Sequence, residues 1–381
     1  MHEGRGEFVA SPKTCSFSIV VKEVACGLNH SHLVTKDGFL YSMGSNEDGK
    51  LGIGLSHKDL PESQSPRLVE GIKHVKSVSA GQSHSLAIVK EGKVYGWGQA
   101  EYGAIGMRIV NALQPSEIQF DQAGLKITQT SCGSRHSAFL TSKRYHFQLV
   151  GNGEVLMCGS GSQGQLGIGY MPVKEYRPVK AMVDERIVKV SCGDLHTGFL
   201  TDQGNAYITG DNSLCQLGIG HQGVLYVSRP ILMTHFTGSS TIKDMCCAHL
   251  GSYSFAINTR NEVYIWGYYQ SSVASTSMPL RIDLPNELRS ISQITCSRNI
   301  VSILDKYGKV WVWSAQKGDE NLKSIPSIPT QVEVLKSSTI KKVYLGHSFI
   351  VSMGHTVGDP THNRAVTQPQ TQTKAPISQV R

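Results

Sequence analysis

Residues 21–54 read VKEVACGLNHSHLVTKDGFLYSMGSNEDGKLGIG, and residues 187–220 read IVKVSCGDLHTGFLTDQGNAYITGDNSLCQLGIG. Both stretches contain a glycine followed three residues later by a histidine, and both end in Leu-Gly-Ile-Gly. Related copies begin at residues 75 and 127, and weaker copies begin at residues 242, 291 and 340. A repeat of this kind predicts one structural unit used many times rather than several unrelated domains.

Seven anchor positions mark the repeat, and they are Gly27, Gly81, Gly133, Gly193, Ala248, Ser297 and Gly346. Short alternating apolar runs lie between glycine-containing turns within each unit. Residues 84–89 and 93–97 are predicted to form a hairpin, preceded by a strand at residues 75–80. Three or four antiparallel strands per unit, repeated seven times, predict an all-β fold, a seven-bladed β-propeller.

The two ends of the chain decide how the ring closes. The seventh unit ends soon after Met353 without its outer strands, and residues 7–21 contain the strand-like run SFSIVV. Because an open ring would leave strand edges unpaired, we expect the N-terminal segment to pair with the seventh blade. Residues 355–381 are polar and rich in Pro, Gln and Thr. They predict a disordered tail after a propeller of residues 1–354.

The composition limits the class of protein. The 381 residues include 39 Gly and only 17% charged residues, which favours many short strands and tight turns. The net charge of +8 contains no run of five Lys or Arg, so there is no specific nucleic-acid signal. The sequence shows no membrane segment and no signal peptide, and its nine cysteines include no C-x-x-C pair. We therefore expect an intracellular protein, cytoplasmic or nuclear, with reduced thiols.

The repeat resembles that of the regulator of chromosome condensation (RCC1) family. In the first unit the resemblance rests on Gly27, His30, Gly44, Gly49 and Gly52, and the second to fourth units carry most of the same pattern. It extends over residues 15–353 when the weaker units are included. The resemblance implies a propeller that binds other proteins through the loops of its faces.

A dinucleotide fingerprint, G-x-G-x-x-G, also occurs at residues 159–164. It would need a helix after the last glycine, whereas two more glycines follow with no helical period. Gly159 and Gly164 recur in the first unit as Gly44 and Gly49, so turns explain them. We expect no cofactor.

The histidines and cysteines of the repeat are also expected to be structural. His30, His84, His136 and His196 belong to four different blades and cannot converge on one metal ion, so no metal is expected. We expect each of them to be satisfied by backbone groups between blades. In the fifth and sixth units Gly251 and Ile300 stand at the histidine position. The cysteines before the anchors are predicted to be small buried hydrophobes.

The third unit has nine extra residues, because 23 positions separate His136 from Gly159 where 14 separate His30 from Gly44. The middle of this longer hairpin carries Lys143, Arg144, Tyr145, His146 and Phe147. Side chains of these types are common at interface hot spots, so these five are candidate partner-binding residues. A tolerated surface insertion is the alternative.

Two functions are open on this sequence. The loops of a propeller favour a protein-interaction module or adaptor without enzymatic chemistry. The resemblance implies an alternative, guanine nucleotide exchange on a Ran-like small GTPase, which needs a surface that binds the nucleotide-free GTPase most tightly. Exchange-competent relatives tend to carry acidic residues in the G-x-x-H turns. Asp194 is the one acidic residue in those turns of the first four units, and it is the sixth candidate partner-binding residue.

Overall fold

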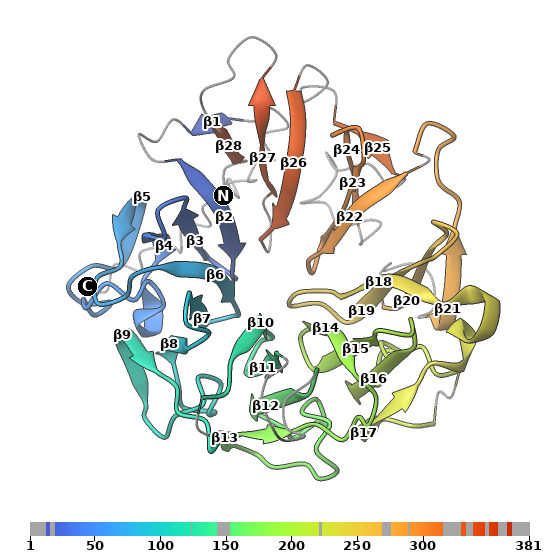
Figure 1. Cartoon of the computed structure of the whole chain (residues 1–381), viewed down its shortest axis with the longest axis horizontal. Helices are drawn as coiled ribbons and strands as arrows, with labels where there is room; N and C mark the ends of the chain where they lie inside the picture. Colours follow the sequence, from blue (N-terminus) through green and yellow to red (C-terminus); the bar gives the residue numbers. More distant parts are fainter. Residues whose placement is uncertain are drawn as a thin grey trace, which may run out of the picture.

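In the computed structural model of the chain, seven four-stranded antiparallel sheets surround a central axis (Figure 1). The residues described are 13–15, 20–122, 124–142, 153–220, 223–268, 276–288, 290–314, 329–332, 338–346, 350–356 and 364–367. None of the helices in these ranges is long and apolar enough to cross a membrane.

Six sheets are built from four consecutive strands each, and they are numbered here as blades 1 to 6. Blades 1 to 3 consist of β2 (Val21–Cys26), β3 (His30–Thr35), β4 (Leu40–Ser45) and β5 (Glu62–Leu68); β6 (Val75–Ala80), β7 (His84–Val89), β8 (Val94–Gln99) and β9 (Asn111–Glu117); and β10 (Ile127–Cys132), β11 (His136–Thr141), β12 (Val155–Gly159) and β13 (Glu175–Lys180). Blades 4 to 6 consist of β14 (Ile187–Cys192), β15 (His196–Thr201), β16 (Ala206–Asp211) and β17 (Tyr226–Leu232); β18 (Ile242–Cys247), β19 (Tyr253–Asn258), β20 (Val263–Gly267) and β21 (Thr276–Ile282); and β22 (Ile291–Cys296), β23 (Ile300–Asp305), β24 (Val310–Ser314) and β25 (Thr330–Gln331). Short 3-10 helices lie at Glu47–Gly49, Thr234–Phe236 and Gly238–Ser240.

The remaining sheet is a composite of the two ends of the chain, in the order β1-β28-β27-β26. It contains β26 (Ser338–Leu345), β27 (Ile350–Thr356), β28 (Arg364–Thr367) and β1 (Lys13–Cys15). The N-terminal strand β1 joins this sheet by pairing with β28, and β28 pairs with β27. The inner strands β26 and β2 are also in contact. The all-β propeller fold is confirmed, with six blades of consecutive strands and one composite blade.

The predicted boundary at residue 354 and the disordered tail after it are wrong for part of the segment. Strand β27 continues to Thr356, and residues 364–367 form β28 between β27 and β1. The physical reason is the edge of β27, whose backbone donors and acceptors would otherwise lack a neighbouring strand. The other residues of the predicted tail lie outside the described residues.

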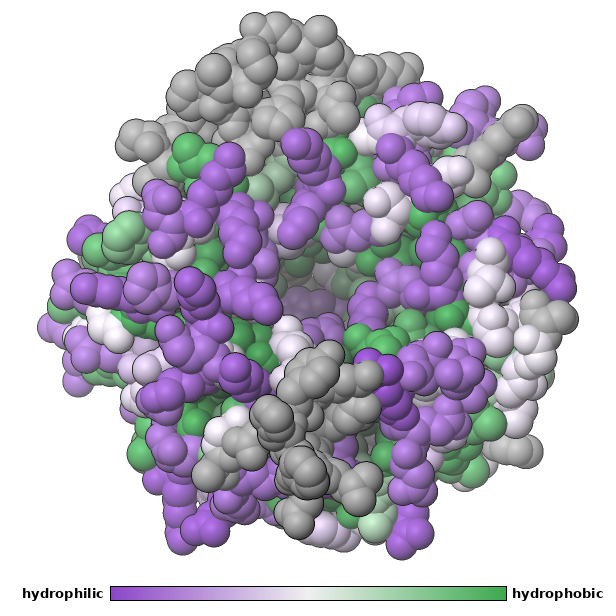
Figure 2. All heavy atoms as spheres, in the orientation of Figure 1, coloured by the Kyte–Doolittle hydropathy of each residue, from purple (hydrophilic) through white to green (hydrophobic). Residues whose placement is uncertain are grey.

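The innermost strands share one burial pattern. In β6, β14, β18 and β22 the first, fourth and sixth residues are buried, whereas the second is exposed and the third and fifth are half-buried. A register shift after the first residue of each strand produces this pattern. The third and fifth residues contact the innermost strand of the next blade, as Gln129 does with Val190 and Ser131 with Cys192. Figure 2 shows a hollow at the centre of the ring, bordered by hydrophilic and hydrophobic residues.

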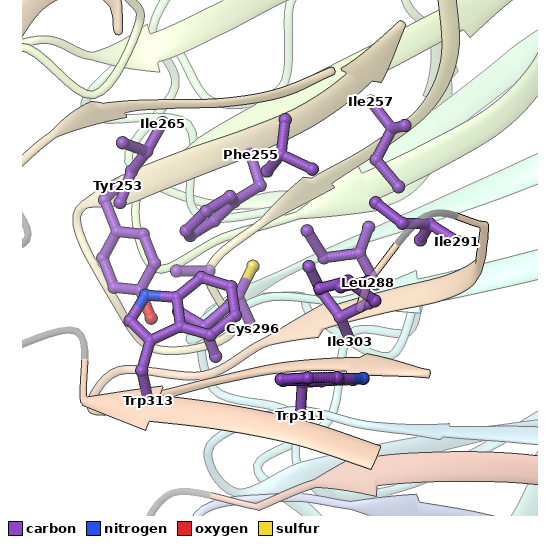
Figure 3. Close-up of a cluster of buried hydrophobic side chains, with 14 residues drawn as sticks. Tyr253, Phe255, Ile257, Ile265, Leu288, Ile291, Cys296, Ile303, Trp311 and Trp313 are labelled. Atoms are coloured by element: carbon purple, nitrogen blue, oxygen red, sulfur yellow. The ribbon is translucent and has the colours of Figure 1, made fainter. Parts of the chain in front are cut away.

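Apolar cores lie between neighbouring blades rather than at one central point. Every residue of the second strand is buried in all six blades, because each blade is covered on both sides. Figure 3 shows the core between blades 5 and 6, where Phe255 from β19 meets Trp313 from β24 with ring centroids 5.9 Å apart. Each interface between blades therefore carries its own share of the stability.

The strand ends define two faces, which we call the loop face and the turn face. The loop face carries the turns between first and second strands and the long loops between third and fourth strands. Those loops are residues 46–61, 100–110, 160–174 and 212–225 in blades 1 to 4. The turn face carries the short turns between second and third strands and the connections between blades.

Candidate functional site

The repeated histidines join each blade to the next. Each ring is buried, and its Nε2 lies within hydrogen-bond distance of a hydroxyl on the second strand of the next blade. The distances are 3.0 Å for His30 and Ser85, 2.9 Å for His84 and Ser137, 3.0 Å for His136 and Thr197, and 2.8 Å for His196 and Ser254. The expectation of a backbone partner is therefore wrong for Nε2, because a side-chain hydroxyl takes that place.

Tyr253 takes the histidine position in blade 5. It begins β19 and pairs with Gly267, as His30 begins β3 and pairs with Gly44. Its hydroxyl donates a hydrogen bond to the carbonyl oxygen of Ser297 in blade 6. The assignment of Gly251 to this position is wrong, since the turn of blade 5 is two residues longer. Ile300 begins β23 and does occupy the position in blade 6.

The anchor glycines allow this close approach between blades. A Cβ atom on Gly133 would lie 2.2 Å from Cε1 of His136 and 2.6 Å from the carbonyl oxygen of Gly193, the anchor of the next blade. Gly27 and Gly81 are enclosed in the same way. Glycine is required here because any side chain would overlap both the ring and the next backbone.

Burial makes the histidines unsuited to acid–base chemistry. Loss of solvation lowers the pKa of His84, His136 and His196 to about 3, so the rings are neutral near pH 7. No group of three or more His, Cys, Asp or Glu in the described part of the chain is arranged to hold a metal ion. The cysteines before the anchors, Cys26, Cys132, Cys192, Cys247 and Cys296, are buried as predicted.

Asp194 lies on the loop face, and its carboxylate already accepts a hydrogen bond from a neighbouring blade. The Ser134 hydroxyl, in the turn between β10 and β11, donates a hydrogen bond to the Asp194 carboxylate in the corresponding turn of blade 4. The candidates Lys143, Arg144, Tyr145, His146 and Phe147 lie outside the described residues. Ser142, just before them, is at the opposite end of the six-residue strand β11, roughly 20 Å from Ser134 by strand rise. Asp194 and the ends of the insertion are therefore on opposite faces.

The rim of the loop face carries exposed apolar side chains that the sequence reasoning missed. Of the twenty exposed large hydrophobic residues in the described ranges, eleven lie there, and they form the apolar band: Leu55, Ile109, Val110, Leu113, Tyr170, Met171, Val173, Leu214, Val224, Leu225 and Tyr226. Val110 is 73% exposed and Val173 is 67% exposed. The signal in the sequence is an apolar residue shortly after the last turn glycine in each of units one to four. An apolar residue that recurs in this way is also what a buried core position of a repeat would show.

The band continues from blade to blade because each long loop rests on the outer strand of the next blade. Gly54 N donates to Leu113 O at 2.9 Å, joining the first loop to β9. Gly169 N donates to Ser228 O of β17, and Gly220 N to Ser277 O of β21, both at 2.8 Å. These backbone bonds give the exposed side chains a fixed support.

A cationic cluster lies beside the band at the junction of blades 2 and 3. The Arg135 guanidinium lies 4.4 Å from the ring centroid of Tyr102, and the Lys174 ammonium lies 5.5 Å from the same ring. Lys174 also forms an ion pair of 3.2 Å with Glu101. An exposed arginine on a tyrosine ring next to apolar side chains is a typical composition for a protein interface. Together with Asp194, this surface can bind a partner by apolar and ionic contacts.

Comparison with proteins of known sequence gives relatives that are mostly longer. The Arabidopsis thaliana ultraviolet-B receptor UVR8 is 28% identical over 319 residues, which is 81% of this chain and 68% of the receptor. The probable human E3 ubiquitin-protein ligase HERC6 is 29% identical over 311 residues, which is 80% of this chain but 28% of the ligase. The chain thus spans just over a quarter of HERC6.

Solved structures and a family model agree on the fold. Human WBSCR16 has a TM-score of 0.73 at 20% identity, covering 93% of this chain and 88% of that one. Yeast RCC1 (Prp20), solved bound to Kap60, has a TM-score of 0.72 at 20% identity, covering 89% and 81%. Residues 3–351 match the model of the RCC1-like domain. The chain therefore belongs to the RCC1-like domain family.

Proposed function

We propose that this chain is a protein-interaction module whose partners dock on the loop face, with the apolar band as the main contact. The observation that carries the proposal is the concentration of eleven of the twenty exposed large hydrophobic residues of the described ranges in four adjacent loops and the strands that follow two of them. Scattered apolar residues are normal on a protein surface, whereas a continuous group with a polar rim is typical of interaction sites. Arg135, Lys174 and Asp194 supply that polar rim.

The relatives support proteins as the class of partner. The part of HERC6 that matches this chain is a minor share of that ligase. Such a share is expected if the matched part is an interaction module attached to other domains. The structural study of Prp20p from Saccharomyces cerevisiae, at 18% identity and a TM-score of 0.68, concerns its binding to Gsp1p and histones. A small GTPase, which the resemblance of the repeat implies, is one candidate partner, and nucleotide exchange remains the alternative activity.

The insertion in blade 3 is proposed as a second contact, on the turn face. Lys143, Arg144, Tyr145, His146 and Phe147 would act independently of the loop face, because their flanking residues lie at the other end of β11. A variant lacking residues 142–150 separates the two surfaces. Proteins lost only with this deletion would bind the turn face, and proteins lost only with loop-face variants would bind the apolar band.

Serine substitutions at Val110, Val173 and Leu225 test the loop face, since these side chains are exposed on three successive blades. Combined in one variant, they are expected to lower recovery of bound partners by on the order of tenfold or more, because losing several interface anchors costs more than 1.4 kcal/mol. The measurement is cross-linking followed by quantitative capture. The folded state should be unchanged, because none of the three is in a core.

A variant with Phe39→Ser and Tyr307→Ser is the matched control, because it removes comparable exposed apolar side chains from the turn face. Equal recovery with the triple variant and the wild type would contradict the proposal. The captured partners and a panel of small GTPases are then assayed for release of labelled GDP. Binding without acceleration is expected; acceleration by catalytic amounts of the chain would favour the exchange alternative.

A further inference from the structure

Two thiols meet at the interface between blades 5 and 6. Sγ of Cys296, in β22, lies 2.9 Å from Sγ of Cys246, in β18, and donates a hydrogen bond to it. This separation is longer than a disulfide bond of about 2.05 Å, so the two cysteines are not linked. Cys296 is buried in the core drawn in Figure 3, whereas Cys246 is half-buried and packs against the same core from the inner strand β18.

The pair arises from a departure from the repeat. Cys246 is the fifth residue of its inner strand, and blades 2, 3 and 4 have Ser79, Ser131 and Ser191 at that position. The Ser79 hydroxyl lies 3.2 Å from Sγ of Cys132 in the next blade, so a hydroxyl and a thiol meet there in the same way. A cysteine in place of that serine turns a structural contact into a pair of thiols.

The backbone near the two cysteines is already held together. His249 and Ser297 form a parallel bridge between the blades, and His249 N donates to Cys296 O at 3.1 Å. Forming a disulfide would require the two sulfur atoms to approach by about 0.9 Å. Side-chain adjustment can supply a movement of that size without separating the blades.

The surroundings make the two thiols unequal. The hydrogen bond from Cys296 lowers the pKa of Cys246 most, and the Lys189 ammonium adds to this, against the opposing effects of burial and of Asp244. Lys189 is paired with the Asp244 carboxylate. Burial raises the pKa of Cys296 well above its usual value. Cys246, whose pKa is lowered, is therefore the better nucleophile, and Cys296 can act as its resolving partner.

We propose that Cys246 and Cys296 form an oxidation site at which hydrogen peroxide creates a disulfide between blades 5 and 6. The Cys246 thiolate attacks one peroxide oxygen, the O–O bond breaks, and the departing hydroxide takes a proton to leave as water. The Cys296 sulfur then attacks the resulting sulfenic acid, the S–S bond forms, the S–O bond breaks, and the Cys296 proton leaves with the hydroxyl as a second water. The thiols lose two electrons and the peroxide gains two.

The test treats the full chain with hydrogen peroxide and counts free thiols after denaturation. Nine thiols before treatment and seven after it are expected, with a linked peptide pair containing Cys246 and Cys296. The link closes a loop of about 50 residues, so the thermal midpoint should rise by about 3 °C or more. A dithiol reductant should reverse both changes.

Three variants keep the test independent of folding defects. Cys246→Ser installs the residue that blades 2 to 4 use, so it should fold, keep its remaining thiols and show no rise in midpoint. Ser79→Cys builds the equivalent pair with Cys132 and should lose two further thiols on oxidation. Cys132→Ser, away from the pair, should respond as the wild type does. Nine thiols retained by the treated wild type, oxidation of Cys246 without a link to Cys296, or an unchanged response in Cys246→Ser would each overturn the proposal.

Discussion

The substitution Gly133→Ala is expected to destabilise the folded chain by about 3 kcal/mol or more. This is the scale of destabilisation for an overpacked site at which the backbone cannot move to relieve the overlap. The new Cβ would overlap the His136 ring at 2.2 Å and the Gly193 carbonyl at 2.6 Å. Moving the ring would break its hydrogen bond to Thr197, and moving Gly193 would open the interface between blades 3 and 4. Denaturant unfolding followed by circular dichroism measures the change.

Gly223→Ala is the matched control. Gly223 lies in an exposed loop, a Cβ atom added to it would meet no other atom within 4 Å, and its backbone is not left-handed. Its replacement should change the unfolding free energy by no more than about 0.5 kcal/mol. If G133A were as stable as G223A, the anchor glycines would not be holding adjacent blades in close approach.

Acid is expected to unfold the protein between about pH 6.5 and pH 4. Burial lowers the pKa of His32, His84, His136 and His196 to about 3 in the folded chain, while an unfolded histidine titrates near 6.5. Between these values the unfolded chain binds protons that the folded chain excludes. Stability is therefore fully present above about pH 6.5 and falls as the pH is lowered, by up to about 1.4 kcal/mol per pH unit for each histidine.

His136→Gln tests the assignment of this pH dependence. The substitution removes one side chain that binds a proton in the unfolded chain but not in the folded chain. The slope of the unfolding free energy against pH, between pH 6 and pH 5, should therefore fall by about 1.4 kcal/mol per pH unit. The exposed His57 is the control site, and His57→Gln should leave the slope as in the wild type. An unfolding free energy that is constant from pH 7 to pH 5 would show that the buried rings accept protons without loss of structure.

The strands of the repeat could be predicted from sequence because the repeat period and the alternation of apolar and polar residues encode them locally. Residues 75–80 and 84–89 are β6 and β7 as predicted. The partners of the histidine rings were missed because they lie in the next unit, 53 to 61 positions away, although a recurring His-Ser or His-Thr pair carried the signal. The longer turn before Tyr253 was missed because counting from an anchor assumes turns of equal length.

The surface was harder to predict than the fold, for a physical reason. Val110, Val173 and Leu225 occupy positions where a repeat gives apolar residues, and sequence alone does not separate an exposed apolar side chain from a buried one. Exposure is decided when each loop packs on the outer strand of the next blade. The insertion was visible in the sequence as extra length, yet that length did not show on which face its flanking residues Ser142 and Gly153 would lie.

Hydrogen exchange of the chain with and without a partner captured by the wild type tests the central claim most directly. Binding through the loop face predicts slower exchange in residues 46–61, 100–110, 160–174 and 212–225, with little change in the turn-face segments 202–205, 259–262 and 306–309. Slower exchange confined to those turn-face segments, with none in the four loops, would contradict the account.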